Sequence, residues 1–217
     1  LCAAGVYLCC MRSGMAPETC AYFAVFVSMG SNLFWMSTSD GVWFLAQLCG
    51  LLFAVWGLYF AQGHGAVQAA LASLCMALAV GCRPFYALLL ACWLVWRAYK
   101  QRSVRTLLPA LLPAAAAAVA MMAYNYVRFG SVTEFGHNYL PEFTRADYGQ
   151  FSLHYLLPNL LQLLRPVTLD AQGVLQFEQF NGFLFFIANP LFLLAMLRGA
   201  AVSLPGRAEL CRNDLPL

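Results

Sequence analysis

The chain has 217 residues, of which 62% are hydrophobic, 15% aromatic and only 10% charged. This apolar fraction exceeds what a water-soluble domain can bury, so the composition excludes a soluble protein and predicts a polytopic membrane protein. The net charge of +3 at pH 7 is small and no long basic run occurs, which excludes nucleic acid as a partner.

Uncharged runs predict the membrane spans. They cover 19–39, 41–82, 106–127 and 179–197, and about 20 apolar residues are enough to cross a bilayer as a helix. Turn sequences such as "QGHG" and "GCRP" divide these runs further. We therefore expect an all-α bundle of about seven transmembrane helices. The expected helices are 1–11, 20–37, 43–61, 66–81, 85–97, 106–126 and 180–198.

The start of the chain predicts that this is a piece of a longer protein. It opens with "LCAAGVYLCCM", which has neither an initiator Met nor the basic residues of a leader peptide. We expect a transmembrane domain over 1–198 whose N-terminal part is missing, followed by a cytoplasmic tail at 199–217.

The distribution of Lys and Arg predicts the orientation, because cytoplasmic loops retain positive charge. If "RAYKQRSVR" is cytoplasmic, strict alternation of the helices places most basic residues inside. The outside then receives "STSDG", "GCRP" and a long loop over 126–179. Within that loop, "FSLHYLLPNLLQLLRPV" is too short an apolar segment to span a bilayer, so we expect an interfacial helix.

Two charged residues stand at the predicted outer ends of helices. Arg83 precedes Pro84, and a helix from there to Arg97 is too short to cross the membrane, so Arg83 is expected below the outer surface. A recessed arginine at a helix N-terminus suits an anion, although it could instead reach lipid headgroups or pair with an acid. Asp40 could cap the helix at 43–61 or act as an external carboxylate.

The stretch that begins at Tyr124 gathers most of the remaining polar chemistry. Asn125 lies at the end of an alanine-rich run and could line a cavity or bond a neighbouring helix. Arg128 follows it, and Gly130 permits an abrupt turn of the chain over the bundle. Further candidates for a substrate cavity are Tyr126, Glu134, His137 and Tyr139. The tyrosines could equally anchor the interface as an aromatic belt.

The cysteines and the common motifs indicate no other chemistry. All of the nine cysteines except Cys211 lie in or beside apolar runs, without CxxC pairs or zinc-type spacing, so we interpret them as packing residues. No metal site is predicted. GxGxxG, Walker A, GxSxG and HExxH sequences are all missing.

The segment "YNYVRFGSVTEFGHNY" resembles the N-Y-x-R-F-G-S-x-x-E-x-G-Y segment of the polytopic GT-C glycosyltransferases that use polyprenyl-phosphate-linked sugars. These are the protein mannosyltransferase and aminoarabinose transferase type. His137 stands where a Tyr is usual. "ALAVGCRPFYALLL" and "SDGVWFLAQLCGLLFAVWGLYF" add weaker similarity, so that the resemblance extends over roughly residues 20 to 198.

The resemblance implies a bacterial plasma-membrane enzyme that transfers a sugar from a lipid phosphate to an acceptor on the external face, with inversion. It implies Arg83 and Arg128 as donor-phosphate contacts and Asp40 as a secondary acid. The catalytic acid of the family lies in its first external loop, which we expect upstream of Leu1. No cofactor is evident. The resemblance does not specify the sugar, the acceptor or a divalent metal.

Two other classes of membrane protein would gather charges in the same way. A secondary transporter or a lipid-phosphate flippase would place them beside a cavity, and a non-catalytic scaffold would hold the same lipid without chemistry. Transporters tend to contain internal repeats, and no convincing repeat occurs in this sequence.

Overall fold

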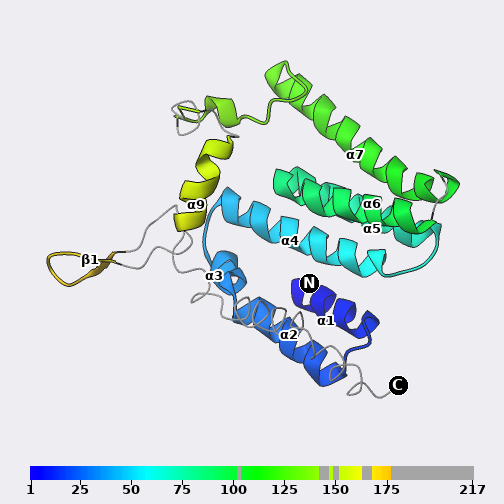
Figure 1. Cartoon of the computed structure of the whole chain (residues 1–217), viewed down its shortest axis with the longest axis horizontal. Helices are drawn as coiled ribbons and strands as arrows, with labels where there is room; N and C mark the ends of the chain where they lie inside the picture. Colours follow the sequence, from blue (N-terminus) through cyan, green and yellow to red (C-terminus); the bar gives the residue numbers. More distant parts are fainter. Residues whose placement is uncertain (102–103, 142–146, 149–151, 163–167, 177–217) are drawn as a thin grey trace, which may run out of the picture. The chain divides into compact units, whose positions relative to one another are not determined.

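The computed structural model describes residues 1–101, 104–141, 147–148, 152–162 and 168–176, and most of them are helical (Figure 1). The chain divides into two compact units, Leu1–His137 and Asn138–Leu217. The helix expected at 180–198 and the tail expected at 199–217 lie outside the described residues.

The first unit contains seven α-helices within its described residues. They are α1 (Cys2–Arg12), α2 (Pro17–Met29), α3 (Asn32–Thr38), α4 (Val42–Ala61), α5 (Ala66–Cys82), α6 (Ala87–Gln101) and α7 (Val104–Phe129). A short 3-10 turn, η1 (Pro84–Tyr86), leads directly into α6. Five of the expected helices correspond to α1, α4, α5, α6 and α7, with ends that differ by a few residues.

The single helix expected over 20–37 is wrong. The structure divides it into α2 and α3, whose axes are bent by 48°. Gly30 ends α2, and the side chain of Ser31 then caps α3 by accepting a hydrogen bond from the backbone N–H of Leu33 at 3.2 Å. A glycine followed by a capping serine favours a new helix start over continuation.

The described helices support a membrane protein. Helices α4 and α7 are long and apolar enough to cross a bilayer, and α2 with α3 makes a third span if the bent pair is counted as one. With 20 residues, α4 is about 30 Å long, which matches the hydrocarbon core. Helices α1 and α5 are apolar but shorter. About seven spans are therefore not confirmed by these lengths.

Helix α5 lies at the centre of the first unit, where it packs against α4, α6 and α7 (Figure 1). Its buried face consists mainly of small residues, including Ala69, Ala72 and Ala79. The face of α4 toward it contains Gly57, where an added Cβ would lie 2.8 Å from Cγ of Met76. Small residues of this kind let helix backbones approach closely, as in membrane helix pairs.

A hydrogen bond joins α5 to α7 near the prolines of α7. The buried hydroxyl of Ser73 donates to the backbone carbonyl of Ala110. This carbonyl lies between Pro109 and Pro113, both inside the helix. Prolines weaken the backbone hydrogen bonding of a helix, and side chains of neighbouring helices commonly bond the affected carbonyls in membrane proteins.

Charged side chains lie at the two ends of these helices. Arg12 donates to the backbone carbonyl of Tyr59 at 2.8 Å, where α1 and α4 finish. At the opposite end, Arg83 donates to the backbone carbonyl of Trp43 at 2.8 Å, which joins the end of α5 to the start of α4. The start of α4 and the end of α5 therefore lie at the same end of the unit.

The second unit is described only in short pieces. They are η2 (His137–Tyr139), which begins at its boundary, η3 (Leu153–Tyr155), α9 (Leu156–Gln162) and the strands β1 (Thr168–Leu169) and β2 (Leu175–Gln176). The expected short apolar helix corresponds to η3 and α9. Its position at a membrane interface stays a prediction.

The paired strands were not expected in an all-α chain. They are antiparallel, with Thr168 opposite Gln176. The carboxylate of Asp170 accepts hydrogen bonds from the backbone N–H groups of Val174 and Gln172 and from the side chain of Gln176. These bonds lower the pKa of Asp170 below its ordinary value because they stabilise the charged form, and the bond from Val174 has the largest effect. The hairpin is therefore organised around one aspartate.

Candidate functional site

The C-terminal end of α7 is the best-formed site among the described residues. The helix ends because Gly130 adopts a positive φ of 71° while its N–H donates to the carbonyl of Tyr126 at 2.8 Å. The chain then reverses, and the side-chain amide of Asn125 donates to the carbonyl of Val132 at 3.4 Å. Glu134 fixes the next turn by accepting from the N–H of Gly136 at 2.7 Å.

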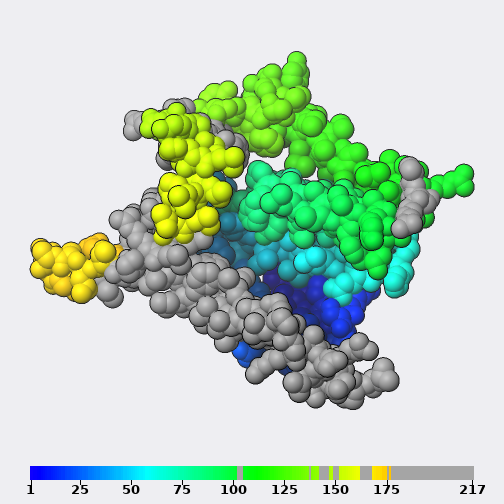
Figure 2. All heavy atoms as spheres, in the orientation of Figure 1, coloured from blue at the N-terminus to red at the C-terminus, as the bar shows by residue number. Residues whose placement is uncertain are grey.

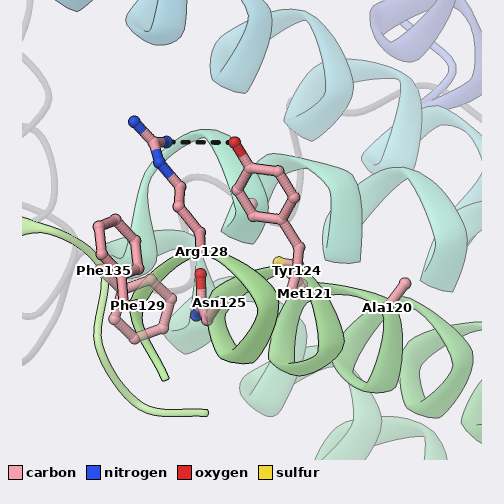
Figure 3. Close-up of a pocket in the computed structure, with 8 residues that line it drawn as sticks. Ala120, Met121, Tyr124, Asn125, Arg128, Phe129 and Phe135 are labelled. Carbon is pink, nitrogen blue, oxygen red and sulfur yellow. Dashed lines mark hydrogen bonds between the residues drawn. The ribbon is translucent and has the colours of Figure 1, made fainter. Parts of the chain in front are cut away.

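This reversal forms a pocket of about 380 Å³ between α5, the last turns of α7 and the returning chain (Figure 3). The surface is hollowed between this end of α7 and the rest of the first unit (Figure 2). Most lining residues are apolar or aromatic. The lining consists of Gly81, Ala120, Met121, Tyr124, Asn125, Arg128, Phe129 and Phe135.

Arg128 is the charged residue of this lining. Its Nη1 donates to the hydroxyl of Tyr124 at 3.1 Å, and its guanidinium carbon lies 5.1 Å from the centre of the Phe129 ring. The side chain is exposed. A guanidinium has five N–H donors, and no other acceptor for them occurs among the described residues. The group is therefore held by aromatic neighbours and retains donors for an anion.

Asn125 is the buried polar residue of the lining, with only 5% of its surface exposed. Because a backbone carbonyl can only accept, the Nδ2 atom must face Val132. The Oδ1 atom then points to the side of the helix from which Arg128 and Tyr124 rise (Figure 3). A mostly buried asparagine with an acceptor at the pocket thus accompanies an exposed cation in an otherwise mainly apolar lining.

Arg83 lies at the same end of the first unit but outside the lining of this pocket. Besides its bond to Trp43, its guanidinium carbon lies 5.1 Å from the centre of the Trp43 ring. Its Nε atom is buried and has no hydrogen-bond partner among the described residues. Of the two arginines predicted to contact the donor phosphate, the pocket lining therefore contains Arg128 but not Arg83, although Gly81 brings the end of α5 to the pocket.

Asp40 does not cap the following helix, so that interpretation is wrong. The cap position of α4 belongs to Gly41, whose φ is 143°, and no side chain bonds the first turn. A side chain caps a helix from the cap position itself, and Asp40 lies one residue before that position. Its side chain is exposed. The external-carboxylate interpretation of Asp40 stays a prediction.

The structure brings only some of the other predicted residues to the pocket. Tyr126 is 61% exposed and does not line it. Glu134 holds the turn at Gly136. The side chain of His137 lies outside what the structure describes, and Tyr139 belongs to the second unit, whose position relative to the pocket is not defined.

Sequence reasoning missed several lining residues, although helical spacing could have identified some of them. Met121, which was missed, lies four residues before Asn125, and Asn125 lies three before Arg128, so the helical spacing places Met121 on the same face as these two predicted residues. Tyr124 lies four residues before Arg128 on that face. Phe135 reaches the pocket through the turn at Gly130, which the sequence predicted from the glycine, but no pattern indicated that Phe135 would line the pocket.

Comparison of the chain with protein-family models, with curated proteins and with solved structures finds no match. Among the described residues, no group of three or more His, Cys, Asp and Glu side chains is placed to hold a metal ion. The chemistry of the pocket is therefore inferred from its lining alone.

Proposed function

We propose that the chain is part of a membrane glycosyltransferase that moves a sugar from a polyprenyl-phosphate donor to an acceptor hydroxyl. The pocket carries this proposal, because Arg128 stands beside an apolar cavity at one end of a membrane helix. A lipid phosphate has the matching chemistry: its chain prefers apolar surface, and its phosphate prefers a guanidinium. The resemblance of the Tyr124–Tyr139 segment to the polyprenyl-phosphate enzymes supports the same ligand.

In the proposed reaction the acceptor oxygen attacks C1 of the donor sugar. The bond between C1 and the phosphate oxygen breaks, the lipid phosphate leaves with its electron pair, and the acceptor proton passes to a general base. Arg128 would stabilise the charge on the leaving phosphate. The base is expected upstream of Leu1, with Asp40 as the secondary candidate.

In this proposal the end of the helices that contains Arg83 and Arg128 faces the outside of a bacterial plasma membrane. Helices α1 to α7 contribute to a bundle of about seven spans, with 126–179 as the external loop. The exposed leucines of η3 and α9, among them Leu153 at 87% and Leu157 at 66%, would lie in the outer interface. Arg83 is the weaker phosphate candidate, because it lies outside the lining of the pocket.

A flippase or transporter for a lipid phosphate is the second candidate. The described lining of the pocket contains no carboxylate that could act as a base. A protein that only moves or holds the lipid needs the cation and the apolar wall but no base.

The test measures binding of a polyprenyl-phosphate sugar to the chain in phosphatidylcholine nanodiscs. We expect Arg128→Ala to weaken binding about 10- to 150-fold, the effect of losing a charge-assisted hydrogen bond. Arg128→Lys retains the charge but not the planar fork, so it should show a smaller loss. Arg105→Ala, an exposed arginine at the start of α7, is the matched control.

Wild-type affinity in both Arg128 variants would remove this residue from the site. Binding without sugar transfer in a protein that also carries the expected upstream loop would favour the flippase or transporter.

A further inference from the structure

The buried amide of Asn125 has one hydrogen-bonding group engaged and one available. Its Nδ2 atom donates to Val132, which fixes the orientation of the amide. Its Oδ1 atom has no donor among the described residues and lies in the wall of the pocket (Figure 3). Although the side chain is only 5% exposed, Oδ1 is not one of the buried atoms left without a partner, so it is accessible from the pocket. A ligand hydroxyl that reaches it can therefore form one net hydrogen bond in place of water.

The position of this acceptor relative to Arg128 restricts the ligand. Asn125 and Arg128 are three residues apart on α7, so their Cβ atoms are about 5 to 6 Å apart on one helix face. The rest of the lining is mainly apolar. A ligand that satisfies both residues must therefore have a hydroxyl or an amine within roughly one sugar ring of its phosphate.

We infer that Asn125 selects among lipid-phosphate substrates by accepting a hydrogen bond from a hydroxyl of the sugar, while Arg128 holds the phosphate. This inference rests on the proposed function, since it concerns the same pocket. It goes further in assigning selectivity to the sugar head, because Arg128 alone would bind any lipid phosphate. Asn125 is thus a specificity residue, whereas Arg128 supplies affinity.

The experiment compares two probes that differ in hydroxyl groups but not in charge. One is a polyprenyl phosphate that carries a single hexose, and the other is the methyl diester of the same polyprenyl phosphate. Both are titrated against the chain in phosphatidylcholine nanodiscs and followed by native mass spectrometry. We expect the hexose probe to bind about 2- to 13-fold more tightly, the effect of one net hydrogen bond.

Two substitutions separate the acceptor from the bond to Val132. Asn125→Leu removes both groups, so the two probes should bind equally. Asn125→Asp retains the acceptor but loses the donor to Val132; its charge repels both probes alike, so the preference for hexose should survive. Tyr126→Phe, in the same turn but outside the pocket lining, should behave as wild type.

The outcomes distinguish this inference from the proposed function. Equal binding of the probes to the wild type, or a preference that survives Asn125→Leu, overturns the role of Asn125 but leaves the phosphate site intact. Loss of the preference in both Asn125 variants shows that the bond to Val132 matters instead, which also overturns it. If the wild type binds neither probe, the proposed function itself fails.

Discussion

The hydroxyl of Tyr124 determines where the guanidinium of Arg128 lies. The two groups are joined at 3.1 Å, and the guanidinium carbon also lies 5.9 Å from the centre of the Tyr124 ring. A free arginine side chain loses considerable rotamer entropy when it binds a ligand. An arginine already held by a neighbour loses less, so Tyr124 should improve phosphate binding without touching the phosphate.

Replacing Tyr124 by Phe tests this positioning role. The ring surface stays, but the acceptor for Arg128 disappears, so we expect lipid-phosphate binding to weaken about 2- to 13-fold, as for one net hydrogen bond. The thermal midpoint should stay unchanged, because Tyr124 is 61% exposed. Binding is measured by the nanodisc titration, with Tyr126→Phe as the control. Unchanged binding alongside a clear loss in Arg128→Ala would show that Tyr124 does not position the guanidinium.

For individual residues, the sequence predicts which polar side chains belong to the pocket better than it predicts their apolar neighbours. Asn125 and Arg128 are conspicuous because a polar residue in an apolar run needs a partner. Phe135 is one of many aromatic residues, and it reaches the pocket only because Gly130 reverses the chain. The tie between Arg83 and Trp43 depends on how α4 and α5 are packed, which local sequence does not specify.

The helices themselves were largely predictable, since apolar length dominates where membrane helices form. The predicted secondary structure is wrong where side chains hydrogen-bond the nearby backbone and so end or redirect an element that hydropathy alone would continue. Ser31 caps a new helix inside an uncharged run, and Asp170 organises a hairpin in a segment with no strand pattern. Both residue types bond nearby backbone groups strongly, and a hydropathy window does not detect this.

The close packing of α4 against α5 can be tested by enlarging a glycine at their contact. Gly57→Leu would force a side chain into the space of Met76, whose Cγ lies 2.8 Å from the expected Cβ position. Overpacking of this kind costs about 1 to 3 kcal/mol, so we expect a clearly lower thermal midpoint in nanodiscs. Ala116→Leu, on an exposed position of α7, should change it little. Equal midpoints for the two variants would show that the helices do not pack closely at Gly57.

For the whole molecule, the distribution of charged residues between the two ends of the helices indicates which end faces the cytoplasm. Arg12 and Lys100 lie where α1 and α6 finish, and both stack on aromatic rings, Arg12 on Tyr59 at 3.9 Å and Lys100 on Trp96 at 5.6 Å. Cations beside aromatic rings are typical of a membrane–water interface. Arg97 and Arg105 lie toward the same end, in the last part of α6 and at the start of α7. The opposite end contains Arg83 and Arg128 together with Glu134, so fewer of the described cations lie there. This distribution matches the positive-inside rule if the pocket faces outward.

The orientation can be tested with single cysteines at two positions. In a background without the native cysteines, we expect Thr133→Cys to react with an impermeant thiol reagent on intact cells, because it follows α7 at the pocket end. Lys100→Cys, at the end of α6, should react only after the cells are permeabilised, because the positive-inside rule places it in the cytoplasm. The cysteine-free parent controls for background labelling. Labelling of Lys100→Cys but not of Thr133→Cys on intact cells would reverse the orientation. The pocket would then open to the cytoplasm, and an external transferase could no longer be proposed.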